Sequence, residues 1–222
     1  MRKIAISDIH GCVRTMTHLV EEVVQLKQQD KLFLLGDYVN RGPDSQGVMD
    51  KVMKWVEAGY DVTCLRGNHE DRVLHGVATG ALELDEKYVN FINSLKIHHE
   101  EEQYIMVHAG LNFEEEDPMK DEHAMRWIRN WELRTNEDWL DGRKVLYGHN
   151  RKDRDVIEYF VETNKPYICI DNGCFMNDMQ PGQGSLVAME LGSEKLTFQP
   201  NIDMESGTKE EDWDYLMDYV RI

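Results

Sequence analysis

The fold is decided by one short stretch near the N-terminus, Ile4-Ala5-Ile6-Ser7-Asp8-Ile9-His10-Gly11. Its three leading apolar residues predict a buried strand, and the polar residues and glycine that follow predict a sharp turn. Side chains alternate along an extended chain, so Asp8 and His10 point to the same side and can share one ligand. The stretch therefore predicts a ligand-binding turn at the carboxyl end of a buried strand.

Four further apolar runs end in the same way, with a residue type that binds metals beside glycine. These endings are GDYVNRG at 36–42, RGNH at 66–69, HAG at 108–110 and GH at 148–149. In α/β sheets, ligands bind at the carboxyl ends of strands, where glycine lets the backbone turn tightly. Oxygen and imidazole donors without a thiolate suit divalent cations such as manganese, iron or zinc. One such ending is usually a cap or a core residue, but five in order indicate a metal site.

Between these endings, apolar residues recur at helical spacing, which is the pattern of a sheet covered by helices. Helices are expected over about 13–24, 45–58 and 70–95. Strands are expected at Ile4–Ile6, Leu32–Leu35, Val62–Leu65, Tyr104–Val107, Val145–Tyr147, Tyr167–Ile170, Ser185–Glu190 and Lys195–Phe198. The alternation of strands and helices indicates an α/β fold.

The length of 222 residues suits one domain with a modest appendage. No linker-like segment precedes about residue 200, so we expect a domain over 1–200 and an extension over 201–222. In the extension, Thr208 and Glu211 predict a capping box for a short helix.

The composition excludes several kinds of partner. The 42 acidic residues outnumber the 25 basic ones, and the net charge of −17 would repel the phosphates of nucleic acids and anionic lipids. No apolar run approaches the roughly 18 residues of a membrane span. A strand begins directly after the first residues, so no leader is expected, and four sparse cysteines indicate reduced thiols. We therefore expect a cytoplasmic protein without a nucleic-acid or membrane partner, and its oligomeric state is left open.

In order and spacing, the five motifs resemble those of the phosphoprotein-phosphatase branch of calcineurin-like metallophosphoesterases. They are SDIHG (7–11), GDYVNRG (36–42), LRGNHE (65–70), HAG (108–110) and GH (148–149). IDNGC at 170–174 is similar to the IDTGC of bacterial members, and symmetrical diadenosine tetraphosphatases are close neighbours in this branch. The resemblance covers Lys3 to about Leu191. It implies a four-layer α/β/β/α sandwich, two metal ions at the mouth of the central sheets, and hydrolysis of phosphate esters.

The resemblance also implies a role for each candidate residue. The implied metal ligands are Asp8 and His10 for the first ion, Asp37 as the bridge, and Asn68, His108 and His149 for the second ion. A carboxylate can span two ions, and neutral imidazoles complete their shells. His69 is implied to protonate the leaving oxygen, and Asn68 also faces the substrate. Arg41 is implied to bind phosphate oxygens, as is Arg129, through a Trp127-Ile128-Arg129 segment similar to the WxR of bacterial relatives.

Three functions fit this pattern. The main expectation is a phosphomonoesterase resembling the Ser/Thr phosphatases, in which a hydroxide bridging two ions attacks phosphorus in line. Manganese is expected first, with iron or zinc as alternatives. The alternative is a hydrolase of dinucleoside polyphosphates such as diadenosine tetraphosphate. A non-catalytic phosphate-binding protein is disfavoured because every implied metal ligand is present, so the expected partner is a phosphorylated substrate, a phosphopeptide or a nucleotide.

One residue departs from the family pattern. Asn40 stands where the family's protein phosphatases have Asp, a carboxylate thought to hydrogen-bond the acid histidine, here His69. An amide can orient the imidazole ring without favouring the imidazolium. We therefore include Asn40 among the catalytic residues and expect His69 to be a weaker acid than in those phosphatases, which keeps the dinucleoside-polyphosphate alternative open.

Overall fold

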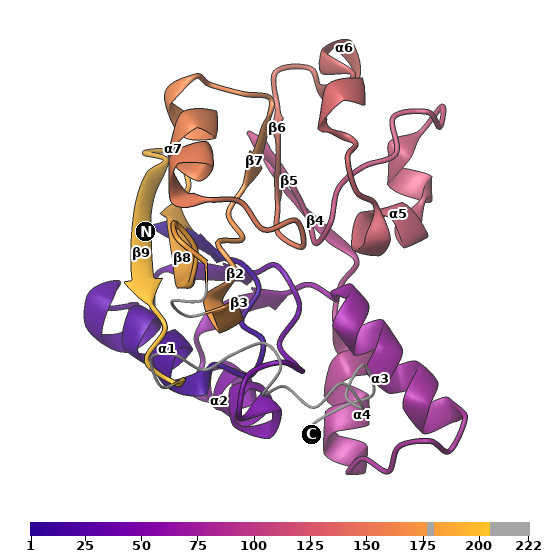
Figure 1. The fold of residues 1–222 in the computed structure, drawn as a ribbon, viewed down its shortest axis with the longest axis vertical. Coiled ribbons are helices and arrows are strands. Elements are labelled where there is room, and N and C mark those ends of the chain that lie inside the picture. The colour runs from indigo at the N-terminus through magenta and orange to yellow at the C-terminus, as the bar shows by residue number, and fades with distance from the viewer. Residues whose placement is uncertain (177–179, 205–222) are drawn as a thin grey trace.

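Two β-sheets face each other at the centre of the computed structural model, which describes residues 1–176 and 180–204 (Figure 1). The first sheet has the order β3-β2-β1-β8-β9. Its strands are β1 (Lys3–Ile6), β2 (Lys31–Leu34), β3 (Asp61–Cys64), β8 (Ser185–Glu190) and β9 (Lys195–Pro200). β1, β2 and β3 are parallel, whereas β8 and β9 add antiparallel pairs beyond β1. The carboxyl ends of β1, β2 and β3 therefore meet at one edge.

The second sheet has the order β4-β5-β6-β7. Its strands are β4 (His98–Glu101), β5 (Tyr104–Val107), β6 (Lys144–Tyr147) and β7 (Tyr167–Cys169). β5, β6 and β7 are parallel, and β4 is antiparallel to β5. The carboxyl ends of β5 and β6 thus lie together, as those of β1 to β3 do in the first sheet.

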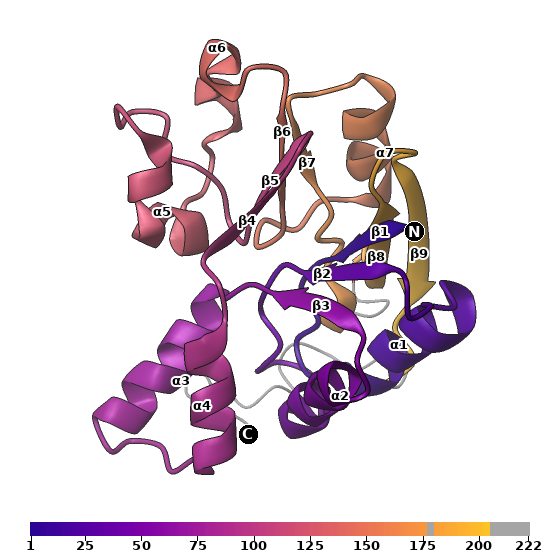
Figure 2. The ribbon, with the colours of Figure 1, turned by 180° about the vertical axis from the view of Figure 1, so that it is seen from behind.

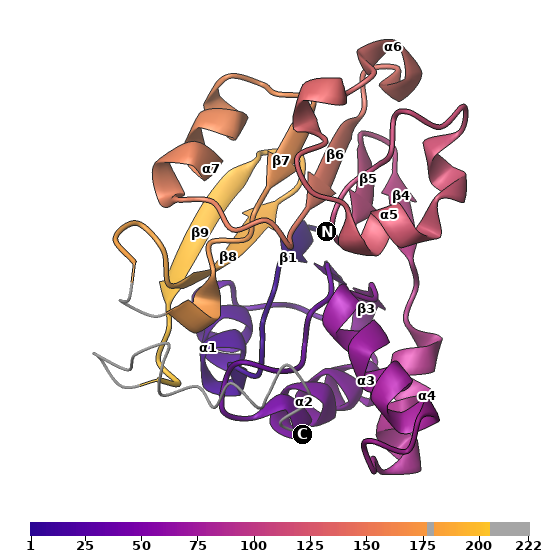
Figure 3. The same ribbon diagram turned by 45° about the vertical axis from the view of Figure 1, so that its right-hand side comes forward.

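Helices cover the outer side of each sheet (Figure 2). On the side of the first sheet lie α1 (Val13–Thr17), the π-helical turn η1 (His18–Val23), α2 (Ser45–Glu57), α3 (Asn68–Ala78) and α4 (Glu86–Ser94). On the side of the second lie α5 (Glu122–Trp127), α6 (Glu137–Leu140) and α7 (Arg154–Glu162). The connections contain three 3-10 turns, η2 (Pro118–Lys120), η3 (Glu132–Arg134) and η4 (Cys174–Met176). Figure 3 shows the strands between these two groups of helices.

Three buried apolar clusters hold the layers together. The cluster between the sheets includes Phe33 and Met189 from the first sheet and Met106 and Leu146 from the second. A second cluster packs the other face of the first sheet against α1, α2 and α4, and a third packs the second sheet against α5, α6 and α7. In β5, Met106 belongs to the middle cluster and its neighbour Ile105 to the outer one, as strand alternation requires. This layering confirms the predicted α/β fold and its α/β/β/α sandwich.

Some elements differ from the sequence expectation. The predicted helix over 70–95 is two helices, α3 and α4, and the one over 13–24 is α1 followed by the π-helical turn. β4 and α7 are not predicted by the sequence pattern. β4 is an edge strand whose residues, such as His98 and Glu100, are partly open to solvent, so it lacks the apolar run of a buried strand.

Residues 201–204 are attached to the domain by specific hydrogen bonds. Asn201 donates from Nδ2 to the carbonyl oxygen of Cys174 at 2.8 Å. Asp203 accepts from the hydroxyl of Thr15 in α1 at 2.6 Å. The domain boundary at residue 200 stays a prediction, and the predicted C-terminal helix lies outside the described residues.

The sequence also led to expectations about membrane-spanning segments and about the cysteines. Within residues 1–176 and 180–204, no helix combines the length and the apolar character needed to cross a membrane. All four cysteines are free thiols, as expected, and three of them, Cys12, Cys169 and Cys174, are buried.

The cluster between the sheets yields a stability prediction. Leu146→Ala should lower the free energy of unfolding by about 2–5 kcal/mol, because it removes apolar contacts and leaves a cavity between the two sheets. Leu133→Ala is the matched control, since Leu133 is 97% exposed, and it should change stability by less than about 0.5 kcal/mol. Urea denaturation measures both, and equal losses for the two variants would contradict the assignment of the core.

Candidate dinuclear metal centre

The residues expected to bind metal follow five strands and converge where the two sheets open. Asp8 and His10 follow β1, and Asp37 follows β2. Asn68 begins α3 after β3, and His108 and His149 directly follow β5 and β6. All six side chains are buried, with at most 8% of any residue exposed. The structure thus brings to one region all six residues that the family resemblance implies as metal ligands.

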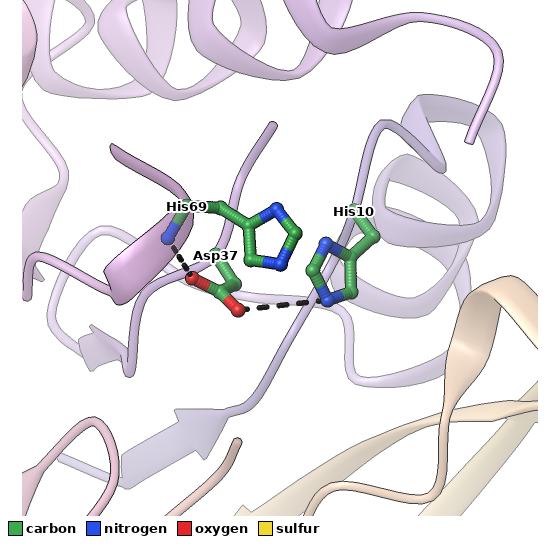
Figure 4. Close-up of side chains that lie close together, drawn as sticks. All are labelled: His10, Asp37 and His69. Carbon is green, nitrogen blue, oxygen red and sulfur yellow. Dashed lines mark hydrogen bonds and ion pairs between the residues drawn. The ribbon is translucent and has the colours of Figure 1, made fainter. Parts of the chain in front are cut away.

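Asp37 contacts several of these side chains, and Figure 4 shows it beside His10 and His69. Its Oδ2 atom is 3.6 Å from Nε2 of His10 and 3.4 Å from Nε2 of His108. Its Oδ1 atom accepts from the backbone amide of His69 at 3.0 Å. Two groups of side chains offer ligand atoms within 4.8 Å of one another: His10, Asp37 and His69, and Asp37, His108 and His149. These two buried clusters share one carboxylate, which is consistent with a dinuclear metal site.

Three of the implied ligands, one of them a member of the second cluster, have further contacts at the site. Asn68 Oδ1 is 3.1 Å from Nε2 of His108, so its amide oxygen faces the second cluster. Nε2 of His149 is buried and has no hydrogen-bond partner among the described residues, as a ligand nitrogen requires. Asp8 accepts from Ser7 Oγ at 2.6 Å and from the backbone amide of His149 at 3.1 Å, and it belongs to neither cluster. The first cluster contains His69, predicted as the acid, and not Asp8, predicted as a ligand. The metal-binding roles of all six implied ligands and the acid role of His69 stay predictions.

The electrostatics of the clusters favour a cation. Burial and the charge of the neighbouring Asp37 together raise the pKa of Asp8 to about 6, against the lowering effect of His108. Burial alone would lower the pKa of His108, but the charges of Asp37 and Asp8 raise it to about 10. These carboxylates therefore attract positive charge, and a divalent cation would supply it by displacing the proton of His108. The donor set of carboxylate, amide oxygen and imidazole fits such a cation.

The backbone is strained at the same place. Five residues of the candidate site have positive φ angles between 48° and 69°, a region that favours glycine: His10, Asp37, Asn40, Arg41 and His149. Left-handed conformations of such residues persist only where the surroundings enforce them, and they concentrate at functional sites. Here they turn the chain sharply at the ends of the strands, so that the side chains point at one another.

Glycine keeps space for the carboxylates. A Cβ atom at Gly67 would collide with Oδ1 of Asp37, and one at Gly148 would collide with Oδ1 of Asp8. The glycines of the RGNH and GH motifs therefore permit close approach of backbone and carboxylate, in addition to tight turning.

Glu70 organises the site, although its role is not predicted from the sequence. It is the last residue of the LRGNHE motif. Its buried carboxylate accepts backbone amides of Asp37 at 2.9 Å, Tyr38 at 2.8 Å, Val39 at 3.3 Å and Gly67 at 2.8 Å. It therefore ties the loop after β2 to the start of α3. Its position three residues after Gly67, the N-cap of α3, is the signal that could have found it, because a Glu there can accept the backbone amide of the N-cap residue, as in one half of a capping box.

His69 and Asn40 form the expected pair. Nδ2 of Asn40 lies 3.1 Å from Nδ1 of His69, and both residues are buried. Burial and the positive charges of Arg41 and Arg72 outweigh the charge of Asp37 and lower the pKa of His69 to about 4. A neutral imidazole is thus favoured at this position in the protein.

The two arginines expected to bind phosphate lie on the exposed rim of the site. The guanidinium carbon of Arg41 is 4.6 Å from the centroid of the Phe175 ring. Arg129 donates from Nη1 to Oδ1 of Asn150 at 2.7 Å, next to His149. Their roles stay predictions, but both guanidinium groups lie beside residues of the two clusters.

A family model described as Calcineurin-like phosphoesterase matches residues 1–173. Because this is more than half of the chain, the protein belongs to the calcineurin-like phosphoesterase family. The resemblance of the five motifs is therefore confirmed, and the protein is a member of a family of metal-dependent phosphoester hydrolases.

Similar curated proteins share one name, symmetrical bis(5'-nucleosyl)-tetraphosphatase. The protein from Nitrosomonas europaea is 31% identical over 125 residues, which are 50% of this chain and 45% of that protein. The one from Nitrosospira multiformis is 34% identical over 121 residues, which are 48% of this chain and 42% of that protein. The chain spans less than half the length of these relatives.

Solved structures share the fold at low sequence identity. A suggested diadenosine tetraphosphatase has a TM-score of 0.70 at 20% identity, covering 91% of this chain and 95% of that one. A protein serine/threonine phosphatase from Saccharomyces cerevisiae has a TM-score of 0.66 at 13% identity, covering 93% of this chain and 82% of that one. At these identities the likeness supports the sandwich fold and no particular substrate.

The shared carboxylate yields a prediction on metal binding. Asp37→Ala should reduce the bound divalent ions from two per chain to one or none and lower hydrolysis at least ~100-fold, because both clusters lose their common oxygen ligand. Asp138→Ala, at an exposed carboxylate of α6, is the control and should change neither quantity. Calorimetric metal titration and turnover of p-nitrophenyl phosphate measure the two effects. Full turnover by chelated wild-type protein would contradict a metal-dependent reaction.

Proposed function

We propose that the protein is a dinuclear metal-dependent hydrolase that cleaves phosphoanhydride bonds of dinucleoside polyphosphates. The observation that carries this choice is the contact between Asn40 and the imidazole of His69. Nδ2 of Asn40 donates to Nδ1, which leaves the proton of a neutral ring on Nε2. A neutral imidazole is a weak acid, so this site suits leaving groups that depart as stable anions.

Phosphoanhydrides have such leaving groups. The phosphate chain of a dinucleoside polyphosphate leaves as a stabilised anion and needs little protonation, whereas a serine alkoxide requires a proton. The names of the relatives support the same choice, since those from Nitrosomonas europaea and Nitrosospira multiformis are both symmetrical bis(5'-nucleosyl)-tetraphosphatases. The phosphomonoesterase expected first from the sequence is therefore the second candidate.

The proposed ligands divide around Asp37. Asp8 and His10 would hold one divalent cation, and Asn68, His108 and His149 the other, with manganese proposed as the metal. The two cations, when bound, would lower the pKa of a water molecule and so supply the nucleophile.

The chain's own residues supply orientation and charge. Arg41 and Arg129 would bind non-bridging oxygens of the attacked phosphate in forked geometry, each from the rim of one cluster. His69 would donate a hydrogen bond from Nε2 to the leaving oxygen, with Asn40 fixing the orientation of the ring. The backbone amide of His69 also fixes Asp37, so the acid and the bridging carboxylate are positioned together.

A parallel assay tests the proposed function. The manganese-loaded protein should hydrolyse diadenosine tetraphosphate with a higher kcat/KM than a phosphoserine peptide or p-nitrophenyl phosphate. A higher kcat/KM for the phosphoserine peptide would instead establish the phosphomonoesterase. Hydrolysis of none of the three would favour a non-catalytic phosphate-binding protein.

Asn40→Asp tests the acid directly. A carboxylate beside Nδ1 should raise the pKa of His69 and speed hydrolysis of a phosphoserine peptide at least about tenfold more than that of p-nitrophenyl phosphate, because only the alkoxide needs a proton. The alkaline limb of the pH profile should move upward, since the imidazolium then persists to higher pH. Asn136→Asp adds the same charge at the exposed N-cap of α6 and is the control. Equal effects on both substrates with an unmoved limb would mean that Asn40 does not tune the acid.

A further inference from the structure

Phe175 carries a second guanidinium group beside that of Arg41. The guanidinium carbon of Arg151 is 5.4 Å from the centroid of the Phe175 ring, against 4.6 Å for Arg41. The same ring meets the imidazole of His10 edge-on, with 4.9 Å between centroids. Arg151 therefore lies one aromatic ring away from the first metal cluster, on the rim that also carries Arg41.

Two contacts hold the guanidinium of Arg151 in place, and neither of them is with a carboxylate. Its Nη1 atom contacts the thioether sulfur of Met176 at 2.6 Å, and a thioether is a weak acceptor without charge. Together with the ring of Phe175, this contact orients the guanidinium at the exposed end of its side chain.

The rim arginines also lack carboxylate partners. Within residues 1–176 and 180–204, no acidic side chain forms an ion pair with Arg41, Arg129 or Arg151. Arginines farther from the site do pair with glutamates: Arg134, Arg143 and Arg154. In a chain with 42 acidic and 25 basic residues, three arginines at one rim without a carboxylate indicate a site for an anion.

This rim holds more positive charge than one phosphate needs. Arg41 and Arg129, with two cations, already suffice for the peripheral oxygens of an attacked phosphoryl group. Partial burial of its guanidinium group lowers the pKa of Arg41, and the positive charges of Arg151 and Arg72 also lower it. The charge of Asp37 opposes this shift. The repulsion among these groups would be relieved by a ligand whose negative charge extends past the attacked phosphorus.

We propose that Arg151 binds the phosphates beyond the attacked one and so selects oligophosphates over simple monoesters. This inference rests on the proposed function and adds a residue that neither the motifs nor the family resemblance assigns. The substrate chain would run from Asp37 past the edge of Phe175 to Arg151, with each further phosphate bringing a negative charge to the rim. A monoester with a neutral leaving group has nothing to place there.

Arg151→Gln should lower kcat/KM for diadenosine tetraphosphate about tenfold, mainly through KM, as expected for one lost charge-assisted contact. This loss should exceed the loss for p-nitrophenyl phosphate at least about fivefold. Arg151→Lys keeps the charge but not the fork, so it should recover part of the loss. Arg134→Gln, which removes an exposed arginine elsewhere, is the matched control and should leave both substrates unchanged. Equal losses on the two substrates would mean that Arg151 only supports the loop, and no loss on either would mean that it does not bind substrate.

Inhibition separates this inference from the proposed function. Inorganic tripolyphosphate should inhibit hydrolysis of p-nitrophenyl phosphate more strongly than orthophosphate does, with free metal held constant, and Arg151→Gln should shrink the difference about tenfold. This comparison holds even if diadenosine tetraphosphate is not a substrate, so the two proposals can fail independently. Equal inhibition by both anions in the wild-type protein would overturn the oligophosphate subsite.

Discussion

The geometry of the site depends on one buried carboxylate that lies outside the two clusters of ligand atoms. Glu70 is 0% exposed, and it accepts backbone amides of Asp37, Tyr38, Val39 and Gly67. Burial and the nearby Asp37 raise the pKa of Glu70 to about 7, against the lowering effect of these amides and His108. An anion is kept here only because backbone dipoles replace the water it has lost. Through these hydrogen bonds, Glu70 joins the loop after β2 to the start of α3. The distance between Asp37 in the loop and His69 in the helix is fixed by this connection.

The cost of burying a carboxylate also explains the hydrogen bonds at the other strand ends. Four carboxylates lie buried there, and each is compensated differently: Asp8, Asp37, Glu70 and Asp171. Backbone amides satisfy Glu70, a hydroxyl and an amide bind Asp8, and a turn amide binds Asp171 at 2.7 Å. Asp37 accepts the backbone amide of His69 through Oδ1, and its Oδ2 atom lies 3.6 Å and 3.4 Å from the imidazoles of His10 and His108. The carboxylate placed among imidazoles is therefore the shared ligand of both clusters, and cations bound there would replace the positive charge that those imidazoles would otherwise have to carry.

The parts predicted from the sequence are those set by local pattern. Buried parallel strands are continuous apolar runs, so β1, β2, β5 and β6 and the ligands directly after them could be located. β4 could not, because an edge strand needs no apolar run. The contacts of Arg151 with Phe175 and of Phe175 with His10 exist only in space, since Arg151 and Phe175 follow β6 and β7 in the other sheet while His10 follows β1. Glu70 is hidden for a similar reason, because its amide partners lie 31 to 33 residues away after β2.

The charge distribution also bears on which anions can reach the site. The chain carries a net charge of −17, yet three arginines that form no ion pair within the described part of the chain border the clusters: Arg41, Arg129 and Arg151. A short oligophosphate would interact mainly with this local rim, where its charges meet guanidinium groups and metal. A long polyanion would also meet the acidic remainder of the surface, and repulsion there would grow with its length. With Arg151 binding phosphate as proposed, attraction at the rim and repulsion around it would together favour anions a few phosphates long, a preference that neither the metal ligands nor the fold would provide alone.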